Sequence, residues 1–348
     1  MTSPGQTATS TRKDEHLELA ARSAAVHEGG TGLERLRLRH RALPERDLAD
    51  VALDTVLLGR RLAAPLLISA MTGGTARAAE VNRRLARAAA EHGIGMALGS
   101  GRVLLEDASL VPTFFDGGGG ARPPLLMANL GAAQLREPRV EERADRLVTL
   151  LEADALVVHL NPLQEAVQPE GQPRFARVAD AIRRVADHLA PLPVVAKEVG
   201  FGMHEADVAL LRDAGVAAVD VAGAGGTNWA TVEGLRSEEA ARTAAAFGAW
   251  GIPTAEAVRR AARAAPGLTV VASGGLHDGV DAAKCLALGA SAAGFARPLL
   301  LAARADYATE WLATVLRQLR IAVWLAGVAR PADLTTEHLD DHDRPTGR

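Results

Sequence analysis

The sequence predicts a (β/α)8 barrel of the α/β class, a TIM barrel, with an N-terminal extension and closing C-terminal helices. The chain has 348 residues, an ordinary length for that fold, and 48% of them are hydrophobic, enough for a large core. From about Leu62 onward, eight short apolar runs alternate with longer segments of helical period. The alternation alone also fits a doubly wound sheet, which stays open as the alternative.

The eight apolar runs are expected to form buried parallel strands, because each is short and ends in glycine, asparagine or a small polar residue. They cover residues 65–70, 94–98, 125–128, 156–159, 194–197, 218–221, 270–272 and 292–295. Helices are expected between them at residues 78–92, 139–152, 175–189, 205–214, 254–264 and 278–288, with closing helices at 302–328. The barrel therefore spans residues 46–332, between a polar, Arg-rich extension at 1–45 and a polar tail at 333–348.

Composition excludes several classes of function. Acidic and basic side chains nearly balance, at 42 and 39, so the chain lacks the charge of a general nucleic-acid or membrane-surface binder. No apolar run approaches the ~18 residues of a membrane span, and the first residues lack the apolar centre of a signal peptide. Cys285 is the single cysteine, which excludes cysteine-based metal clusters. We expect a soluble cytoplasmic enzyme.

Polar side chains gather at the expected carboxyl ends of the strands, where barrels of this type place their active sites. Turn geometry explains the glycines there, but it does not explain His159, Gln164, Glu165 and Lys197. Lysine is rare in this chain, with three among 39 basic residues, and one of the three stands at a strand end. These residues predict a functional rim.

Glycine-rich turns after the last two strands indicate an anion site. Residues 273–275 (SGG) and 294–298 (GFARP) each precede a helix, whose free backbone N–H groups can cradle a phosphate. Residues 222–229 add glycines and the Thr227 hydroxyl. No glycine fingerprint of a dinucleotide-binding fold follows a first strand with an acidic partner.

The run HLNPLQEAVQPEG at residues 159–171 carries the densest chemistry. His159 and Asn161 alternate along a strand end, and Gln164 and Glu165 follow on the connection beyond Pro162. A carboxylate beside amide groups suits Mg²⁺, which also takes oxygen ligands from substrate phosphates. A transition metal is less favoured, since no second histidine or cysteine stands at ligand spacing. A loop whose polar groups satisfy one another is the structural alternative.

Together with ISAMTGGT, KEVGFGM and GGTNW, this run resembles the type 2, FMN-dependent isopentenyl-diphosphate delta-isomerases, and the resemblance extends from residues 12–20 to 319–334. It implies a (β/α)8 enzyme that interconverts isopentenyl and dimethylallyl diphosphate with reduced FMN, Mg²⁺ and NADPH as reductant. It also implies a cytoplasmic homotetramer or homo-octamer with a small-molecule substrate and no nucleic-acid or membrane partner.

The resemblance assigns site residues position by position. Those assigned to FMN are Ala70, Met71, Thr72, Ser100, Asn129, Lys197, Thr227, Gly274, Gly275 and Ala296. Those assigned to the substrate and its diphosphate are Arg12, Lys13, His159, Asn161 and Gln164, with Glu165 as the Mg²⁺ ligand. Gln164, Trp229 and Glu233 are the catalytic candidates beside the alkene.

Five positions depart from the pattern of these isomerases. They are Gly101, where glutamine is usual, and Gln172, His204, Ala249 and His277. These departures leave open a relative that acts on another prenyl diphosphate. A second alternative is an FMN-dependent oxidoreductase of the hydroxy-acid oxidase or dihydroorotate dehydrogenase type, which needs a base and a carboxylate-clamping arginine that the rim does not offer. A non-catalytic flavin-binding protein is the third, and the run at 159–171 argues against it.

Overall fold

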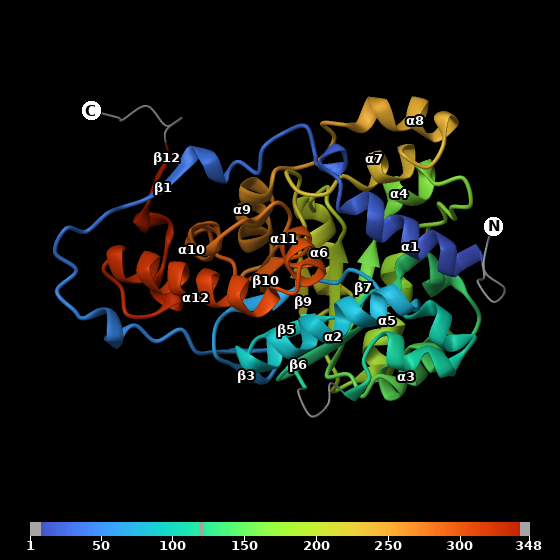
Figure 1. Ribbon diagram of the computed structural model, residues 1–348, viewed down its shortest axis with the longest axis horizontal. Helices are drawn as coiled ribbons and strands as arrows, with labels where there is room; N and C mark the ends of the chain where they lie inside the picture. The colour runs from blue at the N-terminus through green and yellow to red at the C-terminus, as the bar shows by residue number, and fades with distance from the viewer. Residues whose placement is uncertain (1–7, 118–121, 342–348) are drawn as a thin grey trace.

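The computed structural model describes residues 8–117 and 122–341, and its centre is a closed barrel of eight parallel strands (Figure 1). Each strand pairs with its neighbour in the chain, and the last pairs with the first. In order they are β4 (Leu66–Ile68), β5 (Gly95–Ala97), β6 (Leu125–Gly131), β7 (Ala155–Leu160), β8 (Val194–Glu198), β9 (Ala218–Asp220), β10 (Thr269–Ala272) and β11 (Ala292–Phe295). All eight expected strands are confirmed, and the doubly wound alternative is excluded.

The expected helices are also confirmed, and they surround the barrel (Figure 1). They are α2 (Ala76–Glu91), α3 (Val140–Leu150), α5 (Val178–Leu189), α6 (Glu205–Asp213), α9 (Thr254–Ala264) and α10 (Gly279–Ala287), and the closing helices are α11 (Arg297–Arg304) and α12 (Ala308–Leu325). In α5 the buried residues Val178, Ile182, Val185 and Leu189 recur at helical spacing, which gives the helix one apolar face. The first turn of α2 is capped by Thr75, whose side chain accepts from the Ala78 N–H.

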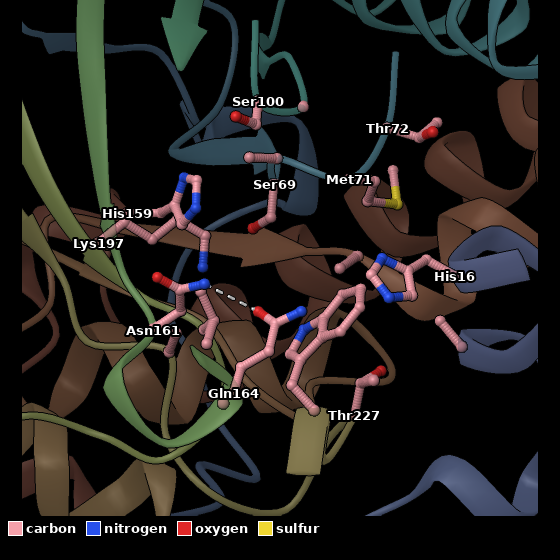
Figure 2. Close-up of a pocket in the computed structure, with 18 of the residues that line it drawn as sticks. His16, Ser69, Met71, Thr72, Ser100, His159, Asn161, Gln164, Lys197 and Thr227 are labelled. Carbon is pink, nitrogen blue, oxygen red and sulfur yellow. Dashed lines mark hydrogen bonds between the residues drawn. The ribbon is translucent and has the colours of Figure 1, made fainter. Parts of the chain in front are cut away.

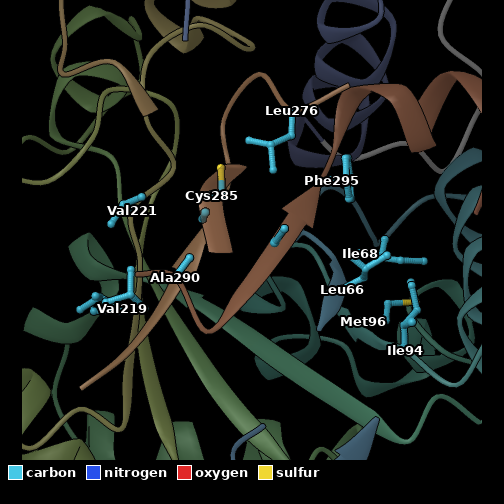
Figure 3. Close-up of a cluster of buried hydrophobic side chains, with 14 of the residues drawn as sticks. Leu66, Ile68, Ile94, Met96, Val219, Val221, Leu276, Cys285, Ala290 and Phe295 are labelled. Carbon is cyan, nitrogen blue, oxygen red and sulfur yellow. The ribbon is translucent and has the colours of Figure 1, made fainter. Parts of the chain in front are cut away.

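Alternation along each strand produces two apolar layers. Leu66 and Ile68 on β4 belong to the larger cluster between strands and helices (Figure 3), whereas Leu67 belongs to the cluster inside the barrel. The interior cluster also contains Leu57 and Leu62, from β2 (Thr55–Leu57) and β3 (Arg60–Leu62). Because this hairpin leads directly into β4 and its leucines pack inside the barrel, it covers the amino ends of the strands. A site can therefore form at the opposite, carboxyl ends.

Several helices near the carboxyl ends of the barrel strands were not expected from the sequence. They are α1 (Ala8–Ala20), α4 (Pro162–Val167), α7 (Trp229–Gly234) and α8 (Glu238–Ala244). Helix α1 contacts α2 and α7 and lies beside α4 and α7 in Figure 1. Gln164 and Glu165, expected on an irregular connection, stand instead on α4, because Pro162 suits the first position of a helix.

The N-terminal extension pairs with the C-terminal part of the chain. Strand β1 (Leu36–Leu38), in the extension, pairs antiparallel with β12 (Leu339–Asp341), within the expected polar tail. Residues 342–348 of that tail lie outside the described residues. Within residues 8–117 and 122–341, no helix is long and apolar enough to cross a membrane.

Candidate active site

A cavity of about 280 Å³ lies at the carboxyl ends of the strands and is covered by α1 (Figure 2). Its lining includes every site residue expected from the sequence except Glu233. These are Arg12, Lys13, Ala70, Met71, Thr72, Ser100, Asn129, His159, Asn161, Gln164, Glu165, Lys197, Thr227, Trp229, Gly274, Gly275 and Ala296. Segments that are far apart in the sequence therefore meet around one space.

Helix α1 brings two cations to the cavity. Lys13 Nζ donates to the Gly73 carbonyl at 2.6 Å and to the Ser100 carbonyl at 3.1 Å. Burial, together with the positive charges of Arg12 and Arg102, lowers the pKa of Lys13 to about 7. Arg12 Nη1 lies 3.6 Å from Glu170 Oε1. The roof of the cavity therefore offers positive charge to an anion.

The His159 ring is held in a neutral form. Asn129 donates its Nδ2–H to the Leu98 carbonyl at 3.0 Å, so its Oδ1 faces His159 Nδ1 at 2.7 Å. Because that oxygen only accepts, we assign the ring proton to Nδ1, which leaves Nε2 as an acceptor. Burial, reinforced by the charge of Lys197, lowers the pKa of His159 to about 4. In this state the Nε2 edge cannot donate to a phosphate.

Lys197 is paired with a carboxylate that the sequence analysis missed. The register of the barrel sets Lys197 opposite His159 on one side and Asp220 on the other. Lys197 Nζ lies 3.5 Å from Asp220 Oδ2 and donates to the Glu198 carbonyl at 2.7 Å. Asp220 Oδ1 in turn accepts from Ser273 Oγ at 2.6 Å. A buried cation is thus compensated by a buried anion next to the cavity.

The first turn of α4 gathers three polar side chains, because positions three and four apart share a helix face. Asn161 Nδ2 lies 3.1 Å from Gln164 Oε1 (dashed in Figure 2) and 3.1 Å from Glu165 Oε1, and it donates to both. The backbone N–H of Gln172 donates to Glu165 Oε2 at 2.6 Å. Among the described residues, the buried Asn161 Oδ1 finds no partner.

Glu233 stands behind this turn and reaches the cavity through Gln164. Its carboxylate is fully buried: Oε1 accepts from Gln164 Nε2 at 2.8 Å and lies 3.0 Å from His16 Nε2, and Oε2 accepts from Arg236 Nη1 at 2.8 Å. Burial raises the pKa of Glu233, but these three neighbours outweigh it, so the pKa lies below its ordinary value. The sequence analysis missed His16 and Arg236. The available signal for His16 was its place in the RKDEH motif, and that for Arg236 was its position three residues after Glu233.

The residues at the ends of β10 and β11 fit the phosphate end of a flavin nucleotide. Gly274 and Gly275 have φ of +100° and +72°, and a Cβ on either would strike the backbone of Gly223 or Gly225. Within the described chain, their N–H groups have no protein acceptor. The buried Ser69 Oγ, also on the cavity wall, likewise lacks a partner among the described atoms. Unpaired donors beside a cavity suit an anionic, polar cofactor.

The donor set for a metal is small. No group of three or more His, Cys, Asp or Glu side chains in the described ranges could hold an ion. Glu165 and the unpaired Asn161 Oδ1 are hard oxygen donors, of the kind that Mg²⁺ prefers. These residues therefore fit a cation that arrives with a diphosphate, which would supply the remaining oxygens.

Of the positions that depart from the isomerase pattern, two line the cavity, namely Gln172 and His277. Gly101 instead backs onto Leu147, whose Cδ1 would lie 2.6 Å from an added Cβ. His204 caps α6, where its Nδ1 accepts from the Ala206 N–H at 3.2 Å. Among these departures, only those at the cavity wall can change substrate contacts directly.

Comparison with known sequences places relatives over nearly the whole chain. The family model of FMN-dependent dehydrogenases matches residues 14–109 and 124–341. A protein of Stutzerimonas stutzeri named isopentenyl-diphosphate delta-isomerase is 47% identical over 333 residues, which cover 94% of this chain and 96% of the relative. A protein of the same name from Deinococcus radiodurans is 45% identical over 320 residues, which cover 91% and 94%.

Solved structures share the fold at much lower identity. A flavocytochrome b2 mutant with pyruvate bound is 16% identical, with a TM-score of 0.69 over 95% of this chain and 85% of that chain. A mandelate oxidase mutant with benzaldehyde is 24% identical, with a TM-score of 0.63 over 93% and 96%. These two likenesses concern the architecture alone, because one barrel supports many chemistries.

Proposed function

The chain belongs to the FMN-dependent dehydrogenase family and to the isopentenyl-diphosphate delta-isomerases within it, and from this premise we propose its reaction in detail. We propose that it interconverts isopentenyl and dimethylallyl diphosphate with reduced FMN and Mg²⁺. Moving a double bond is redox-neutral, since a proton is added at one carbon and another is lost from a neighbouring carbon. The residues around the cavity must therefore bind a diphosphate and control protons.

The observation that carries the proposal is the Gln164 amide, which is held between Asn161 and Glu233 at the wall of a cavity covered by two cations. An oxidase acting on hydroxy acids would need a strong base at this place. His159 does not provide one near neutral pH, because its pKa of about 4 keeps its basicity low. The arrangement supports isomerisation over that alternative.

Each side chain then has a role in the proposed reaction. Arg12 and Lys13 bind the diphosphate, and Glu165 binds the Mg²⁺ that accompanies it. When bound, FMN supplies an electron-rich ring that can stabilise developing positive charge and exchange a proton. Lys197, at the cavity wall, favours negative charge on that ring.

The remaining three candidates act on the hydrocarbon end. Gln164 orients the alkene or relays a proton, Glu233 accepts a hydrogen bond from Gln164, and Trp229 closes the side of the pocket. His16 stacks edge-on against Trp229 at 5.3 Å between centroids, so the docking of α1 also fixes this wall.

Anaerobic incubation of the FMN-loaded protein with isopentenyl diphosphate and Mg²⁺ tests the proposal. With chemically reduced flavin we expect the dimethylallyl isomer to form without stoichiometric oxidation of NADPH. Full activity with oxidised flavin, or oxidation of a hydroxy acid, would refute the isomerase mechanism. Conversion of a different prenyl diphosphate in place of isopentenyl diphosphate would redirect the proposal to that substrate.

We further propose a cytoplasmic homotetramer or homo-octamer that receives its electrons from NADPH. Light scattering of the purified FMN-loaded protein would give the oligomer mass. Anaerobic flavin reduction by NADPH and by NADH, compared at equal concentrations, would give the reductant preference.

A further inference from the structure

Arg236 lies outside the cavity lining and contacts carboxylates from three separate segments. Its Nη1 donates to Glu233 Oε2 at 2.8 Å, its Nη2 lies 2.9 Å from Glu170 Oε1, and its Nε donates to Glu15 Oε2 at 3.3 Å. Glu233 belongs to α7, Glu170 follows α4 and Glu15 belongs to α1. The Arg236 side chain is only 16% exposed. A planar guanidinium can serve three acceptors in this way, whereas an ammonium group is a single point charge.

Glu233 depends on this partner because its carboxylate is fully buried. Its other close neighbours are the neutral amides of Gln164, at 2.8 Å, and Gln168, at 3.2 Å, and the His16 ring, at 3.0 Å, which is charged only when protonated. Among the described side chains that touch Glu233, Arg236 is the one whose positive charge does not depend on pH. Without it, the buried carboxylate would lose its one permanently charged partner.

The charge on Glu233 fixes the orientation of the Gln164 amide. Gln164 donates Nε2–H to Glu233 and accepts from Asn161 through Oε1. A carboxylate only accepts hydrogen bonds, but a protonated carboxyl group can also donate, which would allow the amide to turn over. An ionised Glu233 therefore keeps the amide nitrogen on its own side. Because Gln164 lines the cavity, this orientation decides which amide atoms face a bound substrate.

We propose that Arg236 is a positioning residue for the isomerisation, which keeps Glu233 ionised, thereby fixes the Gln164 amide, and through Glu15 links this arrangement to the docking of α1. The inference rests on the proposed function. Glu15 and His16 are neighbours on α1, so docking of this helix brings one to Arg236 and the other to Glu233. The same network thus covers the cavity and sets the amide inside it.

A test by pH must account for every charged group near Glu233. Those on α1 are Arg12, Glu15 and His16, the segment after α4 contributes Glu170, and α7 is followed by Arg236. His16 is the other titratable side chain in direct contact with Glu233. His16→Gln, made with and without the Arg236 substitution, separates its titration from that of Glu233.

The first experiment compares Arg236→Gln with Arg236→Lys in the FMN-loaded full chain with isopentenyl diphosphate. For Arg236→Gln we expect kcat to fall between ~10-fold and ~100-fold with KM changed less than about threefold. The acid limb of its kcat profile should move to higher pH, because loss of the cation raises the pKa of Glu233. Arg236→Lys keeps the charge, so its limb should stay near that of the wild type, with a smaller loss of kcat.

The matched control is Arg77→Gln. Arg77 Nη1 donates to Glu18 on α1 at 3.0 Å from an exposed position on α2, so its loss weakens a contact of the same helix without reaching Glu233. We expect this control to keep the wild-type acid limb. An unmoved limb in Arg236→Gln, or equal profiles for the Gln and Lys variants, would overturn the proposal.

The second experiment needs no turnover and compares Tm of the wild type and Arg236→Gln at about pH 7.5 and about pH 5. In the wild type, the lowered pKa of Glu233 stabilises the fold above its unfolded pKa, and this contribution is lost as pH falls through the folded pKa. In the variant, the buried carboxylate destabilises the fold near neutral pH, and protonation relieves this. The Tm deficit should therefore shrink at the lower pH, and a constant deficit would contradict the role of Arg236. If the wild type failed to isomerise the substrate, the proposed function would fall, yet this comparison would still decide whether Arg236 keeps Glu233 ionised.

Discussion

Single residues in the cavity have chemistry that their amino-acid type alone does not give. The pKa of Lys13 is about 7 because of burial and the neighbouring Arg12 and Arg102, and that of His159 is about 4 because of burial and Lys197. Both shifts disfavour positive charge in a space that is expected to receive a diphosphate. A bound anion favours the charged form of Lys13, so binding of the substrate and protonation of Lys13 are coupled.

Lys13 therefore predicts a pH dependence of substrate capture. Since a lysine is charged below its pKa, kcat/KM should fall as pH rises through about 7, approaching a tenfold loss per pH unit. Lys13→Arg keeps its charge across this range, so kcat/KM of this variant should not decrease as pH rises. Steady-state rates between about pH 6 and pH 9 measure the effect. Lys284→Arg is the control, because Lys284 Nζ donates to the Leu33 carbonyl away from the cavity; a fall that persisted in Lys13→Arg would assign the titration elsewhere.

Glu165 gives a prediction about the metal. Glu165→Gln keeps the shape of the side chain but loses the anionic ligand that Mg²⁺ prefers. We expect turnover to fall by at least about tenfold, the loss that even an indirect change at a metal site causes, and FMN to remain bound. Rates over a Mg²⁺ titration, with flavin absorbance as the check, measure both. The same substitution at Glu256, which pairs with Arg260 on α9, should change neither. Wild-type turnover of Glu165→Gln at low Mg²⁺ would show that the metal is held elsewhere.

At the residue scale, sequence reasoning identified the site residues at strand ends and missed those that lie on other segments. Lys197 and His159 were found because each ends an apolar run. Asp220 lies in such a run too, but its role depends on the pairing of Lys197 with Asp220 across β8 and β9. His16 and Arg236 act through Glu233, and that meeting depends on the docking of α1, which no local pattern encodes.

At the scale of elements, the barrel strands were predictable because each is a short buried run between turns. Helix α1 was not, since its residues are mostly polar and few of its described side chains enter the core. It is held largely by polar contacts, such as Asp14 with the Thr75 hydroxyl at 2.7 Å and Arg297 with the Ala20 carbonyl at 3.2 Å. Helices α4, α7 and α8 were missed because they have only six or seven residues each, too few for a helical period.

The glycine turn after β10 is predicted to contribute to FMN binding. Gly274→Ala places a Cβ against the Gly223 backbone at φ +100°, so the turn must move and its free N–H groups with it. We expect FMN affinity to fall by at least about tenfold, equivalent to about 1.4 kcal/mol. Gly267→Ala is the control: its φ of +87° imposes similar strain, but nothing lies within 4 Å of the added Cβ. Flavin titration by fluorescence compares them, and equal losses would attribute the effect to backbone strain alone.

At the scale of the whole molecule, the N-terminal extension runs from α1, which covers the cavity, to β1, which pairs with β12. Arg297 donates to the carbonyls of Ala20 and Ala21 at the end of α1. Further along, Leu33 and Leu36 are buried in the main core, and β1 pairs with β12 near the other end of the chain. Composition predicted a polar extension and tail but not this pairing, because it joins residues about 300 positions apart. The extension is therefore anchored by contacts made well away from the site.

The pairing of β1 with β12 predicts a substitution that changes stability without changing activity. Leu339 is 8% exposed and belongs to the main core, so Leu339→Ala should lower the free energy of unfolding by about 2–4 kcal/mol, as in other buried positions. Leu43→Ala, at a side chain 75% exposed in the same extension, should change it by less than about 0.5 kcal/mol. Denaturant unfolding followed by circular dichroism measures both. Because Leu339 is not among the residues that line the cavity, Leu339→Ala should keep its FMN affinity and its kcat below the unfolding transition. A loss of kcat with intact stability would instead mean that β1 and β12 transmit the position of α1 to the site.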